Sequence, residues 1–151
     1  MDKKEKKIID NTVSELLGLL EINGTFELAG NEEGIDIVLD TKDSGLIIGY
    51  HGDTLESLQL IVSLCIAKKL DKFIRVSIEV GDYKKRRTEW LKNLALTTKE
   101  KVISQNQEIA LPELKSWERR IIHLLLKNDE EVTSESQGEG RDRVLVVGQK
   151  Q

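Results

Sequence analysis

The sequence has 151 residues and a net charge of −4 at pH 7, and 38% of the residues are hydrophobic and 33% charged. This composition is typical of a folded soluble chain; it excludes extended disorder, and no apolar run approaches the about 18 residues of a membrane span. No signal-peptide core opens the chain, and the single cysteine, Cys65, has no partner for an internal disulfide, so we expect a cytoplasmic protein.

The first 81 residues predict a small α/β unit. Apolar residues at helical spacing predict helices, and alternation of apolar and polar residues predicts strands. In chain order the predicted elements are a helix over 4–22, two strands joined by a turn at 30–34, a short helix over 44–48, a helix over 53–70 and a strand over 74–80. This α-β-β-α-α-β order closes a three-stranded sheet covered by helices.

Residues 82–151 predict a second, helix-rich unit. Its predicted elements are a helix over 82–105, a short strand over 107–111, a helix from Pro112 to about 127, and a hairpin with strands over 132–136 and 143–147. Trp90 and Trp117 are expected in its core. We therefore predict an α+β protein of two small domains, residues 1–81 and 82–151.

The segment between the two middle helices reads Gly49-Tyr50-His51-Gly52. Its glycines allow a sharp turn and a close approach to another surface, and the N-terminus of the next helix favours a phosphate. No Gly-Lys-Ser/Thr follows, so this is not a Walker loop, nor does it run from strand to helix as a dinucleotide fingerprint does. A GxxG segment alone is more often a plain turn between helices.

An Ile-Gly-x-x-Gly loop inside an α-β-β-α-α-β unit resembles a KH domain of the type II topology. In that family the loop clamps a strand of about four nucleotides. The resemblance implies that Gly49, Tyr50, His51 and Gly52 contact nucleic acid. The middle positions often include Lys or Arg in the family, so the tips Tyr50 and His51 predict a weaker electrostatic grip, with Tyr50 stacking on a base or sugar. The apolar residues beside the loop are expected to line partly the groove and partly the core: Ile47, Ile48, Leu55 and Leu58.

A helical wheel over residues 114–127 separates an apolar arc from a basic arc. The apolar arc holds Leu114, Trp117, Ile121, Leu124 and Leu125. The basic arc has no acid, with Glu118 projecting elsewhere, and it holds Ser116, Arg119, Arg120, His123 and Lys127. A solvated polar face explains this pattern about as well as a binding face does.

A basic cluster precedes this helix. Residues 84–101 hold seven Lys or Arg and two Glu, whereas residues 21–43 hold seven acids and one lysine. Local fields rather than total charge decide where a polyanion docks. Four cations in the first turn of a helix oppose its dipole, which suggests that a phosphate backbone favours them there, although a solubilising helix start is the alternative. The four are Lys84, Lys85, Arg86 and Arg87.

Trp-Glu-Arg-Arg-Ile-Ile-His, followed by a Ser- and Glu-containing strand and a Gly-rich turn before Arg143, resembles the R-3-H domain, named for its Arg-x-x-x-His. The match covers about residues 82–148. In that family the Arg and His lie on one exposed surface that binds single-stranded nucleic acid. The resemblance implies that Arg119 and His123 do so here, with Arg143 nearby.

Together the two modules resemble the bacterial Jag/KhpB family, whose typical members carry a further N-terminal domain that we do not expect here. The resemblance implies an RNA-binding post-transcriptional regulator or RNA chaperone that grips single-stranded RNA, or single-stranded DNA, without a cofactor, and that has a small KH-domain protein as a further partner. Because the basic cluster and the basic arc lie in the second module, we expect electrostatic attraction to RNA to be stronger there than at the glycine loop. We expect no membrane insertion.

Two other functions compete with this interpretation. An enzyme acting on nucleic acid is disfavoured, because no acidic cluster has metal-ligand spacing and no Cys/His pair predicts a nucleophile. A protein-interaction adaptor, whose KH unit pairs with another KH protein while RNA binding is secondary, stays open. The sequence leaves undecided the RNA target, its bases and the oligomeric state.

Overall fold

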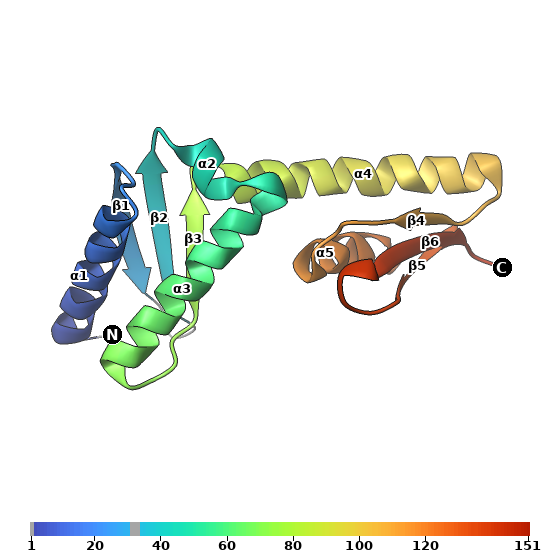
Figure 1. Cartoon of the computed structure of the whole chain (residues 1–151). Helices are drawn as coiled ribbons and strands as arrows, with labels where there is room; N and C mark the ends of the chain where they lie inside the picture. The colour runs from blue at the N-terminus through green and yellow to red at the C-terminus, as the bar shows by residue number, and fades with distance from the viewer. Residues whose placement is uncertain (1, 31–33) are drawn as a thin grey trace. The chain divides into compact units, whose positions relative to one another are not determined.

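The computed structural model describes residues 2–30 and 34–151 (Figure 1). The chain divides into two folded units, Met1–Lys84 and Lys85–Gln151, each of which is described by itself. The turn predicted at residues 30–34 falls mostly on residues 31–33, which lie outside the described part. The mixed helix and sheet architecture with two small sheets confirms the α+β fold class.

The first unit has the predicted order α-β-β-α-α-β. Strand β1 pairs with β2 in antiparallel register, Gly24 opposite Thr41, and β2 pairs with β3 in parallel register, Ile35 opposite Val76. A parallel pair needs a long crossover, which α2 and α3 supply. The bounds are α1 Lys3–Leu19, β1 Gly24–Gly30, β2 Ile35–Thr41, α2 Ser44–Ile48, α3 Asp53–Leu70 and β3 Val76–Val80.

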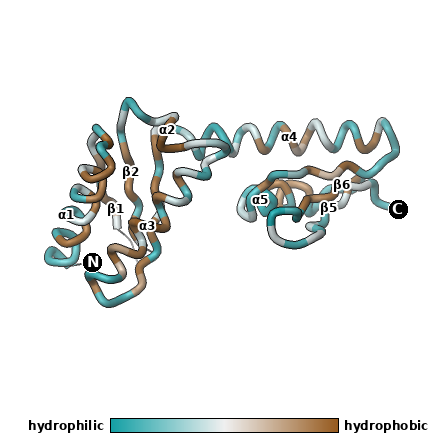
Figure 2. Tube along the Cα trace, viewed as in Figure 1, coloured by the Kyte–Doolittle hydropathy of each residue, from teal (hydrophilic) through white to brown (hydrophobic). Residues whose placement is uncertain are grey.

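One face of this sheet is buried and the other is open. Residues along β2 and β3 alternate between buried and less buried positions, and the buried ones pack against apolar residues of the three helices. Figure 2 shows hydrophobic residues concentrated along these strands and α3. Ile9 on α1 and Ile66 on α3 are completely buried there. The open face carries Glu27, Asp36, Asp40 and Glu79, which alternate with the core positions.

Helix α1 ends three residues before its predicted end. The prediction relied on Gly24 as the stop, whereas Glu21 takes the left-handed conformation with φ 56° and the amide of Ile22 donates to the carbonyl of Leu17. Gly24 instead opens β1, where a Cβ would lie 2.4 Å from the carbonyl oxygen of Asp40. Strand β3 likewise starts at Val76 rather than residue 74, because the carbonyl of Ile74 accepts the Ser63 hydroxyl.

The second unit packs two helices against an antiparallel three-stranded sheet of order β4-β6-β5. Helix α4 begins with the last residues of the first unit and continues through the second. The bounds are α4 Tyr83–Gln105, β4 Ile109–Leu111, α5 Ser116–Leu126, β5 Val132–Gln137 and β6 Val144–Gln149. Its core includes Leu91, Val102, Ile122, Leu145 and Val147.

The prediction that Pro112 lies in the first turn of the following helix is wrong. The helix begins at Ser116, after Glu113 with φ 58° and the extended Lys115. The chain stays extended before the helix because the side chain of Leu114 is buried in the core. The side chain of Glu118 then accepts the amide of Lys115, which fixes the start of the helix.

The buried face of α5 is rotated from the predicted apolar arc. Leu124 and Leu125 are 54% and 46% exposed, whereas Glu118 is fully buried together with Ile122 and Leu126. The wheel placed Glu118 away from both arcs because a helix pattern alone does not reveal a cation on a neighbouring element. Trp90, expected in the core, is 47% exposed, and this expectation is wrong as well.

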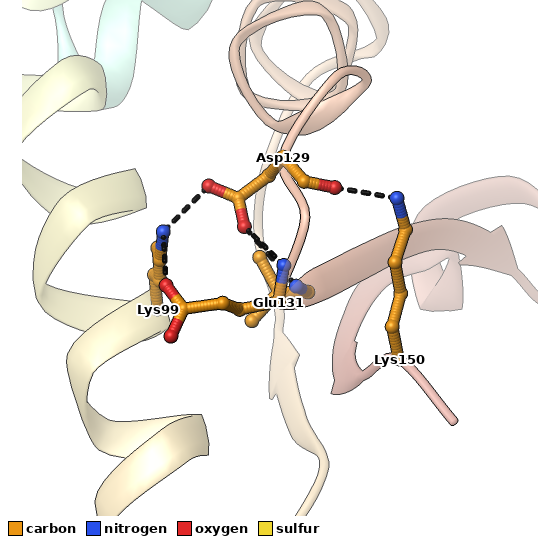
Figure 3. A network of polar contacts seen from close by, with 5 residues as sticks. Lys99, Asp129, Glu131 and Lys150 are labelled. Carbon is orange, nitrogen blue, oxygen red and sulfur yellow. Dashed lines mark hydrogen bonds and ion pairs between the residues drawn. The ribbon is translucent and has the colours of Figure 1, made fainter.

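A network of charges joins α4 to the loop before β5 and to the end of β6 (Figure 3). Lys99 forms ion pairs with Asp129 at 2.7 Å and with Glu131 at 2.8 Å, and Lys150 donates to the carbonyl of Asp129. The hydrogen bond from Lys99 holds the pKa of Asp129 below its ordinary value, and the same contacts raise the pKa of Lys99. The network therefore connects α4 to the loop before β5 and to the residue that follows β6.

Candidate nucleic-acid sites

The glycine loop of the first unit has backbone angles that residues other than glycine adopt only with an energetic penalty. Helix α2 ends at Gly49 with φ 67° and ψ −166°, and a 3-10 turn over Tyr50–Gly52 leads into α3. His51 has φ 50° and Gly52 has φ 80°. A Cβ at Gly49 would lie 2.1 Å from the hydroxyl oxygen of Thr54. The loop is thus a sharply turned segment that requires glycine at position 49, immediately before the N-terminus of an 18-residue helix.

The tips of this loop are aromatic. Tyr50 is 68% exposed and stacks on the ring of His51, with 4.1 Å between centroids and 16° between planes. The Nδ1 atom of His51 is buried and has no hydrogen-bond partner among the described residues. Beside the tips, Leu46 on α2 is 78% exposed, a surface that the sequence interpretation did not single out. The apolar residues expected to line partly the groove and partly the core all belong to the core or pack against it: Ile47, Ile48, Leu55 and Leu58.

Tyr83 and Lys84 are engaged within the first unit. Tyr83 packs against the core, and a Cβ at Gly52 would lie 2.8 Å from its hydroxyl oxygen, so Tyr83 abuts the loop rather than standing free of it. The Nζ atom of Lys84 donates to the hydroxyl of Ser77 at 2.8 Å, and its amide donates to Glu79. Lys84 therefore lies on the open, acidic face of the sheet.

Arg87 has a structural role in the second unit. Its Nε atom lies 2.6 Å from Oε1 of Glu118, and the two side chains are only 12% and 0% exposed. Its guanidinium carbon lies 4.2 Å from the centroid of the Trp90 ring. By contrast, Lys85 and Arg86 are exposed and form no ion pair with any other residue of the described ranges. The basic cluster thus separates into two free cations and two that the fold uses.

Arg119 and His123 are both oriented by neighbours. The guanidinium of Arg119 donates to the carbonyl of Leu114 at 2.5 Å and to the hydroxyl of Ser116 at 3.2 Å. The Nδ1 atom of His123 lies 2.8 Å from the hydroxyl of Ser134, a buried residue of β5. Because Nδ1 is engaged by the strand, Nε2 is the ring nitrogen left for a ligand.

Further cations accompany this pair. Arg120 and Lys127 are exposed on α5 and just after it, and Arg143 is exposed with a hydrogen bond to the carbonyl of Gly138. Glu118 is the acid of α5, and its burial against Arg87 removes a negative charge from the exposed side of the helix. That side therefore offers hydrogen-bond donors and positive charge, which suit phosphate oxygens.

Within the ranges 2–30 and 34–151, no group of three or more His, Cys, Asp or Glu side chains is placed to hold a metal ion. None of the described helices combines the length and apolarity that crossing a membrane requires.

The α-β-β-α-α-β unit with its GxxG turn, followed by a unit with a half-buried Arg119 and an exposed His123 in an Arg-x-x-x-His motif, defines a two-module protein of the KH and R-3-H classes. Residues 6–80 match the KH domain of KhpA and KhpB, and residues 89–148 match the R-3-H domain. The chain therefore belongs to the KhpB family, as the resemblance of its motifs predicted.

Curated relatives agree with this assignment. The RNA-binding protein KhpB of Clostridium symbiosum is 34% identical over 131 residues, which is 87% of this chain and 59% of that protein. The proteins of the same name from Lactiplantibacillus plantarum and Streptococcus pneumoniae R6 are 36% and 30% identical, over 72% and 89% of this chain. The chain spans 34% and 41% of their lengths, respectively.

Proposed function

We propose that this protein binds single-stranded RNA, mainly through the exposed basic side of α5 and additionally through the glycine loop of the first unit. The observation that carries the proposal is the pair of Arg119 and His123, each held by an internal hydrogen bond, on a helix whose acid is buried. Relatives whose names state RNA binding support it. We propose a binding protein rather than an enzyme, acting in the cytoplasm as a regulator of RNA.

The proposed contacts follow from exposure and charge. In the second unit they are Lys85, Arg86, Arg119, Arg120, His123, Lys127 and Arg143. In the first unit they are the loop residues Gly49, Tyr50, His51 and Gly52. The middle two residues of this loop are not Lys or Arg, so stacking of a base on Tyr50 is the proposed source of affinity there. Lys84 and Arg87 leave this set, because their side chains are bound to Ser77 and Glu118.

The proposal predicts strong dependence on salt. About four phosphate contacts on a single strand predict roughly 50-fold weaker binding at 200 mM than at 50 mM salt. Fluorescence anisotropy of a labelled, unstructured RNA measures this, with duplex RNA and single-stranded DNA as comparisons. Arg119→Ala is expected to weaken binding about tenfold, since a charge-assisted contact to phosphate contributes about 1.5–3 kcal/mol.

Matched variants separate the two modules. Lys92→Ala removes an exposed lysine of the second unit that pairs with Glu89, and we expect it to change affinity less than twofold. Gly49→Asp introduces charge into the loop but also strains it, so Tyr50→Asp is the cleaner variant because the Tyr50 side chain is exposed. If the wild-type protein binds none of the three nucleic acids at 50 mM salt, the proposal is wrong.

We also propose a KH-domain partner, in addition to RNA rather than instead of it. Helix α3 exposes Leu60, Ile61 and Leu64 at 61%, 45% and 59%. Acids lie in its first turn and lysines in its last turn, among them Glu56 and Lys68. Two such helices packed antiparallel around the apolar centre would place each Glu56 near the other's Lys68. A KH domain with an equivalent helix is the partner that this pattern fits.

A charge at the centre of this surface tests the pairing. Leu64→Glu is expected to abolish association with a small KH-domain protein in sedimentation velocity experiments, because an unpaired carboxylate would be buried between the helices. RNA affinity of the isolated protein is expected to stay within twofold. Leu96→Glu, at an exposed leucine of α4, is the control. Association that survives Leu64→Glu would show that the partner binds elsewhere.

A further inference from the structure

Trp90 has an environment unusual for an indole. Nearly half of its surface is exposed, in a chain where aromatic residues make up only 4% of the sequence. One face of its ring lies against the guanidinium of Arg87, 4.2 Å from the centroid. The other tryptophan, Trp117, packs against the core. The exposed area of Trp90 therefore needs an explanation that core packing does not supply.

The support behind this ring is fixed. Arg87 is held at 2.6 Å by Glu118, which is fully buried and also accepts the amide of Lys115 at 2.9 Å. An arginine anchored in this way keeps a constant position against the indole, so the ring loses little freedom when a ligand covers its open surface. The contact between Arg87 and Trp90 is thus supported by a buried ion pair in the free protein.

Successive contacts connect Trp90 to the base of α5. Trp90 contacts Arg87, Arg87 binds Glu118, and Glu118 binds the amide of Lys115. The neighbouring carbonyl of Leu114 accepts the guanidinium of Arg119. Apart from the peptide bond between Leu114 and Lys115, each step spans one hydrogen bond, ion pair or ring contact. Trp90 and Arg119 are thus separated by only a few contacts, a span that a few nucleotides can cover.

We propose that Trp90 is a stacking platform for one unpaired nucleobase, with Arg87 fixed on one face of the indole and the base on its open surface. This inference rests on the proposed binding of single-stranded RNA. Arg86 lies four residues before Trp90 on the same helix, where side chains are neighbours, and it contacts the phosphate next to the stacked base. A base in a duplex has both faces covered, so the platform selects single strands.

Intrinsic fluorescence gives a direct test. In a Trp117→Phe protein, Trp90 is the only tryptophan and its emission reports its own environment. Titration with an unstructured RNA is expected to quench this emission in parallel with the rise in anisotropy of labelled RNA. An abasic strand of the same length offers phosphates without bases, and it is expected to raise the anisotropy without quenching.

Substitutions test whether the stacking contributes to affinity. Trp90→Leu, which keeps an apolar side chain over Arg87, is expected to weaken RNA binding about tenfold, and Trp90→Phe about threefold. Circular dichroism and urea unfolding verify that both variants fold. Leu96→Ala removes another exposed apolar side chain of α4 and is expected to change affinity less than twofold.

The outcomes separate this inference from the proposed function. Rising anisotropy with unchanged Trp90 emission, or equal affinities of the wild type and a folded Trp90→Leu variant, would overturn the platform and leave RNA binding intact. No anisotropy change with the wild type at low salt would overturn both. Equal quenching by the abasic strand would show that phosphate proximity, not stacking, changes the emission.

Discussion

Replacing Glu118 with alanine is expected to lower the free energy of unfolding of the second unit by about 3–5 kcal/mol, the effect of breaking a buried ion pair by removing one partner. Glu118 is fully buried, and its two oxygens bind the Nε atom of Arg87 and the amide of Lys115. The substitution leaves a charge in a site only 12% exposed and removes the acceptor that fixes the start of α5. Both losses act on the helix that carries Arg119 and His123.

Tryptophan fluorescence during urea unfolding measures this loss selectively, because Trp90 and Trp117 both belong to the second unit. Glu89→Ala is the matched control: Glu89 also pairs with a cation, Lys92, but its side chain is 63% exposed, and such pairs contribute less than about 1 kcal/mol. The double variant Glu118→Leu with Arg87→Leu is expected to recover most of the stability, because no unpaired charge remains. A folded Glu118→Ala protein that unfolds at the wild-type urea concentration would contradict the central role given to this pair.

Local signals in the sequence were sufficient for much of the fold. The bounds of α2 and α3 agree with the prediction to the residue, because the glycines between them interrupt a pattern that is otherwise helical. The third strand of the first unit follows from the alternation of Val76, Ile78 and Val80, all of which are buried. In both cases the residues that specify the element are neighbours in sequence, so no knowledge of distant contacts was needed.

Long-range contacts explain where the prediction failed. A helical wheel places Glu118 on neither face of α5, since burial of a carboxylate is unfavourable unless a cation comes from elsewhere. Arg87 lies 31 residues earlier and supplies that cation. The same contact removes Arg87 from the expected phosphate ligands. One ion pair thus accounts for two departures from the predicted second site, the burial of Glu118 and the engagement of Arg87.

The expected inequality of the two modules has a physical basis in these contacts. The loop of the first unit offers a sharply turned backbone and a Tyr50–His51 stack, whereas the acids of its sheet occupy the open face. The second unit offers donors held in place by its own carbonyl and hydroxyl groups. For the proposed RNA ligand we therefore expect electrostatic attraction to favour first contact at the second unit, with stacking adding affinity at close range.

Gly49→Ala is expected to destabilise the first unit by about 3 kcal/mol. Gly49 has φ 67° and ψ −166°, a region that essentially only glycine occupies, at a cost of about 1–3 kcal/mol for other residues. A Cβ would also lie 2.1 Å from the hydroxyl oxygen and 2.7 Å from the Cβ of Thr54, and such overpacking costs about 1–3 kcal/mol more. Thr54→Ala should recover only part of the loss, because the strained backbone and the Cβ contact remain.

Hydrogen exchange of the amides in β2 and β3 measures the stability of the first unit independently of the tryptophans. Gly45→Ala is the control in the same short helix: a Cβ added there would have no atom within 4 Å beyond its chain neighbours and its own helix backbone, and an alanine in a helix stabilises by up to about 1 kcal/mol over glycine. Both substitutions add one methyl group, at positions four residues apart. We expect Gly49→Ala to lower the free energy of unfolding and Gly45→Ala to raise it. If the Gly49→Ala variant exchanged at the same rate as the wild type, the strain and crowding assigned to Gly49 would be wrong.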